Sequence, residues 1–147
     1  MTGSDQPEFV VKQSSGASSR HEAELFMARA EQAFRTADQN ALMELFAEDV
    51  VVIFADFPAM RGKETYRKFL AARLARQIGY QPRTTVRVVG DNVIGSSWEA
   101  SWTDAKTGLA MRGRGCEFVT IKDGKIVEFI ASFNAWDDAG GPRTPII

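Results

Sequence analysis

The last third of the chain, from Trp98 to Trp136, constrains the fold more than any other part of the sequence. Leu109 to Ile121 and Lys125 to Trp136 are two long runs of strand-like composition, and Val93 to Thr103 is a third run before them. Asp123-Gly124 separates the last two runs and is a strong hairpin signal, because both residue types tolerate a positive φ. Long antiparallel strands after a helical first half predict a curved sheet wrapped against helices, with a cavity inside.

The residues before Val93 predict three helices and two further strands. The S-x-x-E spacing at Ser19 is that of a capping box and predicts the start of a helix with one apolar face. Asp38 is placed to cap a second, short helix. The β-branched run from Asp49 to Ala55 predicts a buried strand, and Lys63 to about Ile78 predicts a third helix. Thr84 to Val89 then begins a meander of four strands.

This order predicts an α+β fold in which three helices pack in the concave side of a curved, mostly antiparallel sheet, a cone-shaped α+β barrel. We expect residues 1–18 to form a flexible N-terminal arm, residues 19–137 a single domain, and residues 138–147 an irregular C-terminal tail. A chain of 147 residues can bury a real core in one domain without disulfides or metal.

Composition excludes several classes of protein. The net charge of −1 gives no bias toward nucleic acid or anionic membranes, and no apolar run approaches the roughly 20 residues that span a bilayer. The single cysteine, Cys116, excludes an internal disulfide, and together with the single histidine, His21, it cannot make a typical metal site. We therefore expect a cytoplasmic protein with no metal, no cofactor, no nucleic-acid partner and no membrane partner.

Charge is nevertheless distributed unevenly along the chain. Between Arg61 and Arg87 eight basic residues stand against one acidic residue, Glu64. Such a run is compatible with a solvated helix face. It is also compatible with an anionic ligand, or with an acidic partner surface such as the first helices of a second subunit.

Four short segments stand at distinct points of this order: before the first strand, at the start of the third helix, between the last two strands, and near the end of the last strand. They are Leu45-Phe46-Ala47-Glu48-Asp49-Val50, Arg61-Gly62-Lys63-Glu64, Asp123-Gly124-Lys125-Ile126 and Ala131-Ser132-Phe133-Asn134. In this order they resemble the nuclear-transport-factor-2-like superfamily, in particular its polyketide-cyclase-like (SnoaL-like) branch. Arg112, Gly115 and Glu117, taken with Ala131-Ser132-x-Asn134, resemble an uncharacterised bacterial subgroup of that branch. The resemblance covers roughly residues 20–137.

The resemblance implies a pocket inside the cone and a homodimer packed through the outer sheet. Known enzymes of this fold include ketosteroid isomerases, aldol-type cyclases, dehydratases and limonene-epoxide hydrolases, most of which use a buried aspartate paired with a hydrogen-bond donor. This chain departs from the epoxide-hydrolase pattern. The Arg-x-Asp element of those enzymes aligns near Arg112-Gly113-Arg114 or Arg114-Gly115-Cys116, where no aspartate is present.

Alternate side chains of a strand share a face, which divides each long strand into two sets. In the run from Leu109, Arg112, Arg114, Cys116 and Phe118 share one face, and Gly113, Gly115, Glu117 and Val119 share the other. In the preceding strand Trp98, Ala100 and Trp102 oppose Glu99, Ser101 and Thr103, and in the last strand Phe129, Ala131 and Phe133 oppose Ile130, Ser132 and Asn134. Bulges would break these sets.

Aromatic and charged strand residues are the candidate ligand-binding groups. Trp98, Trp102 and Phe133 are candidate pocket walls, although they could equally pack in the core or a dimer interface. Arg112 and Arg114 cannot be buried without a partner. Each must reach solvent, pair with Glu99, Glu117 or Glu128, or bind an anionic or carbonyl oxygen of a ligand.

Asp56 is the candidate general base, because it follows an apolar strand beside Phe57 and would have a raised pKa in an apolar mouth. As a turn former it has an ordinary structural explanation too. Tyr66, on the apolar stripe of the third helix, and Arg114 are candidate donors to an oxyanion, and Asn134 and Cys116 complete the expected ligand-binding set. We otherwise expect Cys116 to be a buried strand thiol, since it has no histidine partner nearby in sequence.

These residues favour a cofactor-independent enzyme that performs proton-transfer chemistry on a small, mostly apolar carbonyl compound. Isomerisation, cyclisation or dehydration would each suit a base and an oxyanion donor in one pocket. Two alternatives remain open at this point. The chain could bind such a ligand without turnover, or it could be an association module whose sheet face joins a partner.

Overall fold

The computed structural model describes residues 16–140. The helices are α1 (Gly16–Arg35), α2 (Gln39–Glu44) and α3 (Lys63–Arg76). The strands are β1 (Phe46–Phe54), β2 (Met60–Arg61), β3 (Gln77–Val89), β4 (Val93–Asp104), β5 (Ala110–Lys122) and β6 (Lys125–Asp137). Of the predicted arm, residues 16–18 belong to α1 and the rest lies outside the described residues, as does the predicted tail from residue 141.

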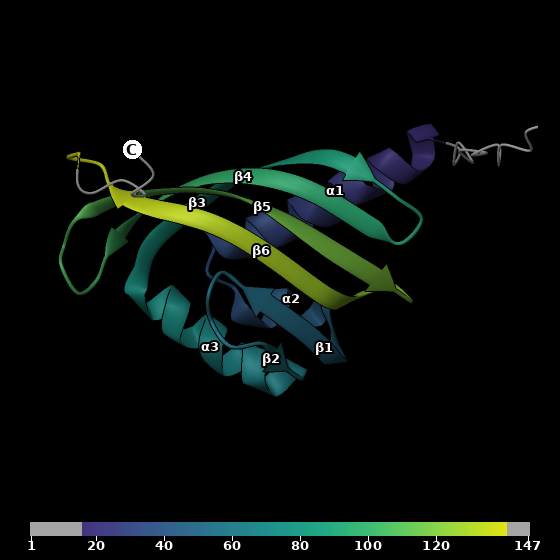
Figure 1. Ribbon diagram of the computed structural model, residues 1–147, viewed down its shortest axis with the longest axis horizontal. Coiled ribbons are helices and arrows are strands. Elements are labelled where there is room, and N and C mark those ends of the chain that lie inside the picture. Colours follow the sequence, from purple (N-terminus) through teal and green to yellow (C-terminus); the bar gives the residue numbers. More distant parts are fainter. Residues whose placement is uncertain (1–15, 141–147) are drawn as a thin grey trace, which may run out of the picture.

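The six strands form one sheet in the order β2-β1-β6-β5-β4-β3. All neighbouring pairs are antiparallel except β1 and β6, which run parallel. Figure 1 shows the four long strands arching over the helices, which all lie on one side of the sheet. This confirms the predicted α+β fold, with three helices in the concave side of a curved, mostly antiparallel sheet.

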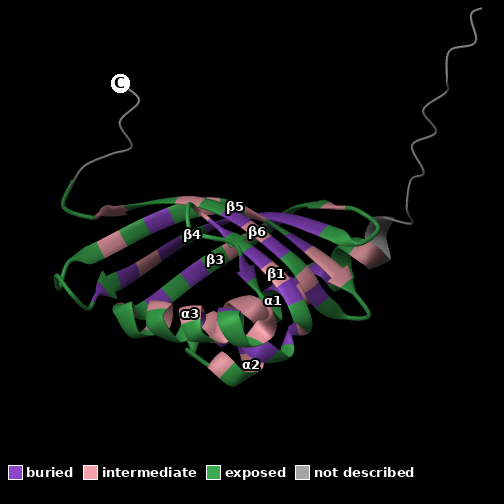
Figure 2. Ribbon diagram, turned by 60° about the horizontal axis from the view of Figure 1, so that its bottom comes forward, coloured by how far each residue is buried: buried purple, intermediate pink, exposed green. Residues whose placement is uncertain are grey.

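Local sequence accounts for the turns that join the long strands. At the β5–β6 turn Asp123 and Gly124 both adopt left-handed backbone angles, with φ of 50° and 74°. Tight hairpins require a positive φ at both central residues, which Asp-Gly supplies at low cost. Burial along the strands alternates with a period of two, visible as the banding in Figure 2, because one face of the sheet packs on the helices.

Two predicted boundaries were wrong. Helix α1 begins at Gly16, so Ser19 lies inside the helix and does not cap it; the S-x-x-E spacing also fits two residues one turn apart within a helix. Helix α3 ends at Arg76, and β3 begins at once with Gln77, well before Thr84. The extra length of β3 comes from pairing with β4, interrupted by a bulge between Ile78 and Gln81.

The second helix starts as predicted, because the Asp38 carboxylate accepts a hydrogen bond from the Ala41 N–H at 3.0 Å. Between the helices and the sheet lies an apolar core whose most enclosed side chains include Leu42, Val50 and Leu70. A second cluster of Tyr80, Trp98, Ala100 and Trp102 lines the sheet near α1. None of the helices in the described residues is long and apolar enough to cross a membrane.

Candidate active site

The structure divides the sequence-predicted site residues between the two faces of the sheet. Trp98 and Trp102 are buried on the concave face, and Phe133 packs beside them with its ring centroid 5.8 Å from that of Trp98. The alternation that buries these aromatic residues turns the remaining strand candidates to the convex face, where all are exposed. Those candidates are Arg112, Arg114, Cys116 and Asn134. They do not share the interior of the cone with the tryptophans.

The convex-face arginines have partners other than the predicted ones. Arg112 Nε lies 3.1 Å from Asp138 Oδ1, and the Arg114 guanidinium lies 5.7 Å from the centre of the Trp136 ring. Pairing with Glu117, one of the alternatives that the sequence left open for the arginines, does not occur, because Glu117 points to the opposite face of the same strand.

Cys116 is exposed on the convex face of β5, so the expectation of a buried thiol is also wrong. Strand alternation puts Cys116 on the same face as Arg112 and Arg114, which the helices do not cover. The position of Cys116 in the alternation of β5, and not the apolar character of its thiol, decides that the side chain is exposed.

A small cavity of about 40 Å³ lies inside the cone, between α1, α3 and the concave face of the sheet. Its walls come from helices α1 and α3 and from every strand except β2, and they include apolar side chains such as Phe34, Phe54 and Trp98. The polar residues of the lining are Glu31, Arg73, Tyr80, Thr84 and Glu117. The lining, apolar with a few convergent polar groups, is that of a small-molecule site, but the volume is well below the roughly 300–1,000 Å³ of such sites.

Glu117 is the carboxylic acid at the centre of the concave face. It lies opposite Ser96 in the β4–β5 register, and the Ser96 hydroxyl donates a hydrogen bond of 2.9 Å to its Oε1. Loss of hydration raises the pKa of Glu117, while the Ser96 hydrogen bond and the charge of Arg73 act in the opposite direction. An acid with a raised pKa in an apolar cavity is suited to taking and returning a proton.

Arg73 brings a cation into the same cavity from the C-terminal half of α3. Its guanidinium carbon lies 5.2 Å from the ring centre of Phe34 and 4.9 Å from those of Phe54 and Tyr80. Its Nε donates to Gln77 Oε1 at 2.7 Å. The basic run from Arg61 to Arg87 is therefore not a uniform solvated face, since this one member turns inward onto aromatic rings.

Two buried tyrosines interact electrostatically with Arg73 and Glu117, and of the two only Tyr80 lines the cavity. Burial raises the pKa of Tyr80 and of Tyr66, and the nearby positive charge of Arg73 opposes the rise in both. Tyr66 is a sequence-predicted catalytic residue, and within the described residues its buried hydroxyl has no hydrogen-bond partner. A buried hydroxyl without a partner is costly, which makes it a candidate donor to a ligand oxygen.

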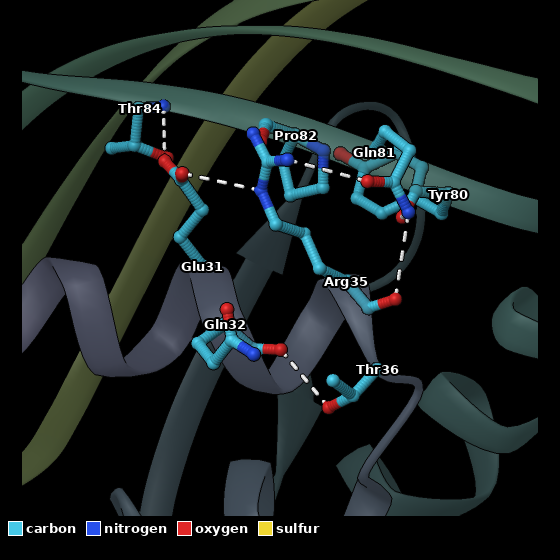
Figure 3. Close-up of polar contacts among 8 residues, drawn as sticks. All are labelled: Glu31, Gln32, Arg35, Thr36, Tyr80, Gln81, Pro82 and Thr84. Atoms are coloured by element: carbon cyan, nitrogen blue, oxygen red, sulfur yellow. Dashed lines mark hydrogen bonds and ion pairs between the residues drawn. The ribbon is translucent and has the colours of Figure 1, made fainter.

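Glu31, the second carboxylate of the lining, is already engaged. It accepts the Thr84 N–H at 2.6 Å, and Arg35 Nε lies 3.3 Å from its other oxygen (Figure 3). Arg35 also donates to the Pro82 carbonyl at 2.7 Å. These contacts fasten α1 to β3 beside the cavity, so Glu31 holds the wall in place and Glu117 is the carboxylate left for chemistry.

Asp56, the sequence-predicted base, lies in the turn after β1 and is exposed. Ala55 before it has a left-handed φ of 50°, which turns the chain away from the sheet. Phe57 after it packs on Phe69 with ring centroids 5.1 Å apart. Asp56 is not among the residues that line the interior cavity.

Gly115 explains how the aromatic wall of the cone is built. It lies opposite both Trp98 and Phe133 in the sheet register, between their rings. A Cβ at this position would come within 2.4 Å of the Ser132 carbonyl oxygen and 3.0 Å of the Trp98 ring. The absence of a side chain therefore lets the two rings meet across β5.

No group of three or more His, Cys, Asp or Glu side chains that could hold a metal ion occurs in residues 16–140. Since Glu31 is engaged by Thr84 and Arg35, the charged and aromatic polar groups of the lining that could hold a ligand are Arg73, Tyr80 and Glu117. Tyr66 interacts electrostatically with all three. Together they offer one acid–base group and up to three donors.

A cone of three helices and a curved six-stranded sheet, with polar groups held inside, is the architecture of the nuclear-transport-factor-2-like superfamily. Within it the chain belongs to the SnoaL-like domain family, whose model matches residues 27–129. No curated protein sequence matches the chain.

Several solved structures share the fold. A proposed polyketide cyclase from Xanthomonas campestris pv. campestris is 21% identical, with a TM-score of 0.71 over 79% of this chain and 93% of that one. A proposed isomerase from Bacillus subtilis is 19% identical, with a TM-score of 0.70 over 79% and 88%. SalBIII, an epoxide hydrolase/cyclase-like enzyme of pyran ring formation in the polyether salinomycin, is 12% identical, with a TM-score of 0.71 over 80% and 97%. At these identities the likeness shows the fold alone.

Proposed function

We propose that this protein is a cofactor-independent enzyme that moves a proton on a small, mostly apolar carbonyl compound, in an isomerisation, cyclisation or dehydration. The single observation that carries the proposal is Glu117, an acid with a raised pKa beside Arg73 and Tyr80 in the cavity. The cyclase and isomerase names of structural relatives agree with this class of chemistry.

In the proposed reaction Glu117, once ionised, removes a proton from the carbon next to the substrate carbonyl. Negative charge then develops on the carbonyl oxygen, where the Tyr80 or Tyr66 hydroxyl donates a hydrogen bond and Arg73 supplies positive charge. Glu117 returns the proton to another position of the substrate. Phe54, Trp98 and Phe129, which line the cavity, form the apolar wall on which the substrate packs.

The size of the cavity bears on what it admits. At about 40 Å³ it has room for roughly three to four water molecules, on a scale of about 10–15 Å³ for each. A carbonyl compound with a ring therefore enters only when lining side chains shift. Phe34 and Arg73 are both partly buried and belong to α1 and α3, the two helices that line the cavity, which makes them the side chains we expect to move.

The experiment uses the proton transfer itself and needs no knowledge of the natural substrate. Wild-type protein in D₂O is mixed with a panel of small ketones (2-indanone, 2-tetralone, cyclohexanone), and loss of the α-proton signals is followed by NMR. We expect wild type to accelerate the α-proton exchange of at least one ketone. The exchange rate with Glu117→Gln should be about 10²–10⁴-fold lower than with wild type, the usual size of an acid–base contribution.

Asp56→Asn is the matched comparison, because it makes the same change from acid to amide at the sequence-predicted base. Loss of exchange in Asp56→Asn with survival in Glu117→Gln would move the base to Asp56 and contradict the assignment made here. No acceleration of any ketone by wild type would favour the second candidate function, a protein that binds its ligand in the same cavity without turnover.

We also propose that two copies pair through the convex face of the sheet. Support comes from an alternating row on that face, in which Glu99 lies opposite Arg83 on one side and Arg114 on the other. Within residues 16–140 the side chain of Glu99 has no ion pair. A two-fold contact brings the same patch of both copies together, so each Glu99 could meet an arginine of its partner.

Light scattering tests this pairing. Wild type should have the mass of two chains, Glu99→Arg should have the mass of one, and Glu44→Arg, at an exposed position of α2, should match wild type. A single-chain mass for wild type, or a dimer that survives in Glu99→Arg, would contradict the pairing.

A further inference from the structure

The environment of Arg73 indicates a property of the substrate. Six basic residues in the described part of the chain have an acidic partner within 4.0 Å, and Arg73 is not one of them. The six residues that do have such a partner are Arg20, Arg35, Lys63, Arg67, Arg76 and Arg112. Arg73 is instead partly buried against three aromatic rings and reaches the cavity lining.

Aromatic faces, the Gln77 amide and a hydrogen bond to the Tyr80 hydroxyl do not use the full binding capacity of the Arg73 guanidinium. The group carries five N–H donors, and Nε is the one that donates to Gln77. The planar pair of terminal nitrogens has the geometry that binds a carboxylate with two parallel hydrogen bonds. Ring contacts stabilise the cation without supplying an acceptor in its plane.

The two carboxylates that line the cavity leave this capacity unused. Glu31 is occupied by the Thr84 N–H and by Arg35, which neutralises its charge. Glu117 accepts the hydrogen bond from Ser96, and within the described residues it forms no ion pair with Arg73 at 4.0 Å or less. Arg73 therefore has no carboxylate partner among the described residues, in surroundings where an opposite charge interacts more strongly than in water.

We propose that the substrate carries a carboxylate on an otherwise apolar skeleton, and that Arg73 binds that carboxylate. The inference rests on the proposed function, because it names the substrate class of the same cavity. A carboxylate held at Arg73 would orient the carbonyl toward Glu117 and the two tyrosines. The apolar part of the substrate would lie on the aromatic wall.

Calorimetric titration with matched probes tests the proposal. The probes are two acids, benzoate and isobutyrate, and their uncharged amides, benzamide and isobutyramide, which have nearly the same shape. We expect wild type to bind at least one acid 10-fold or more tightly than its amide. Arg73→Met should reduce that preference to within about 2-fold, and Arg73→Lys should retain part of it because the charge remains.

Two further measurements keep the result decisive. Arg29→Met removes an exposed arginine of α1 and should leave the preference unchanged. If Arg73→Met does not fold, the Nε–H NMR signal of Arg73 in wild type should shift on addition of the acid and not of the amide. Equal or undetectable binding of each acid and its amide, or a preference that survives Arg73→Met, would overturn the proposal.

Failure of this inference can be separated from failure of the proposed function. Ketone exchange that depends on Glu117, in a protein that does not prefer acids, would leave the proton-transfer proposal intact and overturn only the role of Arg73. A preference for acids that depends on Arg73, without exchange of any ketone, would leave a carboxylate-binding protein and overturn only the catalytic proposal.

Discussion

Replacing Gly115 by alanine should destabilise the fold strongly, although the change adds only one methyl group. The new Cβ would stand 2.4 Å from the Ser132 carbonyl oxygen and 2.7 Å from Phe133 Cβ, about 1 Å and 0.7 Å short of ordinary contact near 3.4 Å. Neither atom can escape by rotation of a side chain, so the β5–β6 pairing must shift. Overpacking typically costs about 1–3 kcal/mol, and we expect about 2–4 kcal/mol here.

Two other glycines calibrate this expectation. A Cβ at Gly113 would meet the far end of the Trp102 ring at 2.9 Å, and a ring can tilt, so Gly113→Ala should cost about 1–2 kcal/mol. A Cβ at Gly90 would lie 3.8 Å from the Val93 carbonyl oxygen, an ordinary contact. Gly90→Ala should therefore be neutral or stabilising by up to about 1 kcal/mol, because alanine has less freedom in the unfolded chain.

Urea denaturation of the three variants measures the free energies of unfolding directly, and thermal melts give a second reading. For a domain of this size 1 kcal/mol corresponds to about 4 °C in Tm, so Gly115→Ala should melt roughly 8–16 °C below wild type. A Gly115→Ala variant as stable as Gly90→Ala would refute the reasoning. It would mean that β6 and the two rings can separate at no cost, and that the aromatic wall is not tightly packed.

Two further predictions concern polar groups. Tyr66→Phe should leave the free energy of unfolding unchanged or raise it by up to about 1 kcal/mol in urea titrations, because the buried hydroxyl makes no hydrogen bond within the described residues. The same variant should slow ketone exchange if that hydroxyl donates to the substrate. Asp104, whose pKa is lowered to about 2 by hydrogen bonds from Arg76 and Thr107, contributes stability that is present above its ordinary pKa of 3.8 and is lost as pH falls toward 2. Melts from pH 5 to pH 2 should show this loss in wild type, and Asp104→Asn should flatten that part of the profile.

Local chemistry accounts for the parts of the fold that were predictable. The Asp123-Gly124 turn, the Asp38 cap and the alternation along β4 and β5 each depend on a few neighbouring residues, and the structure has all of them. The start of β3 depends on a distant partner instead. Residues from Gln77 onward become a strand because β4 extends to Asp104 beside them, which no local pattern encodes.

The candidate site was partly predictable for the same reason. Trp98, Trp102 and Phe133 were assigned to the pocket wall and do lie on the concave face, but Arg112, Arg114, Cys116 and Asn134 do not. Glu117 was considered only as a partner for the arginines. A signal was present, because alternation groups Glu117 with Gly113, Gly115 and Val119, a set otherwise without charge. A lone acid in such a set indicates an interior carboxyl.

The sequence alone determined two sets of side chains on each long strand, because successive residues must point to opposite sides of a sheet. It could not determine which set faces inward, since each set contains large or charged residues that could serve a pocket. The tertiary structure decided this by placing all three helices on the side of Trp98 and Glu117, which leaves Arg114 and Cys116 outside. The tertiary structure also decided that the Arg73 side chain points into the cone, although its neighbours in the sequence include other basic residues. The aromatic rings of Phe34 in α1, Phe54 in β1 and Tyr80 in β3 contact it there.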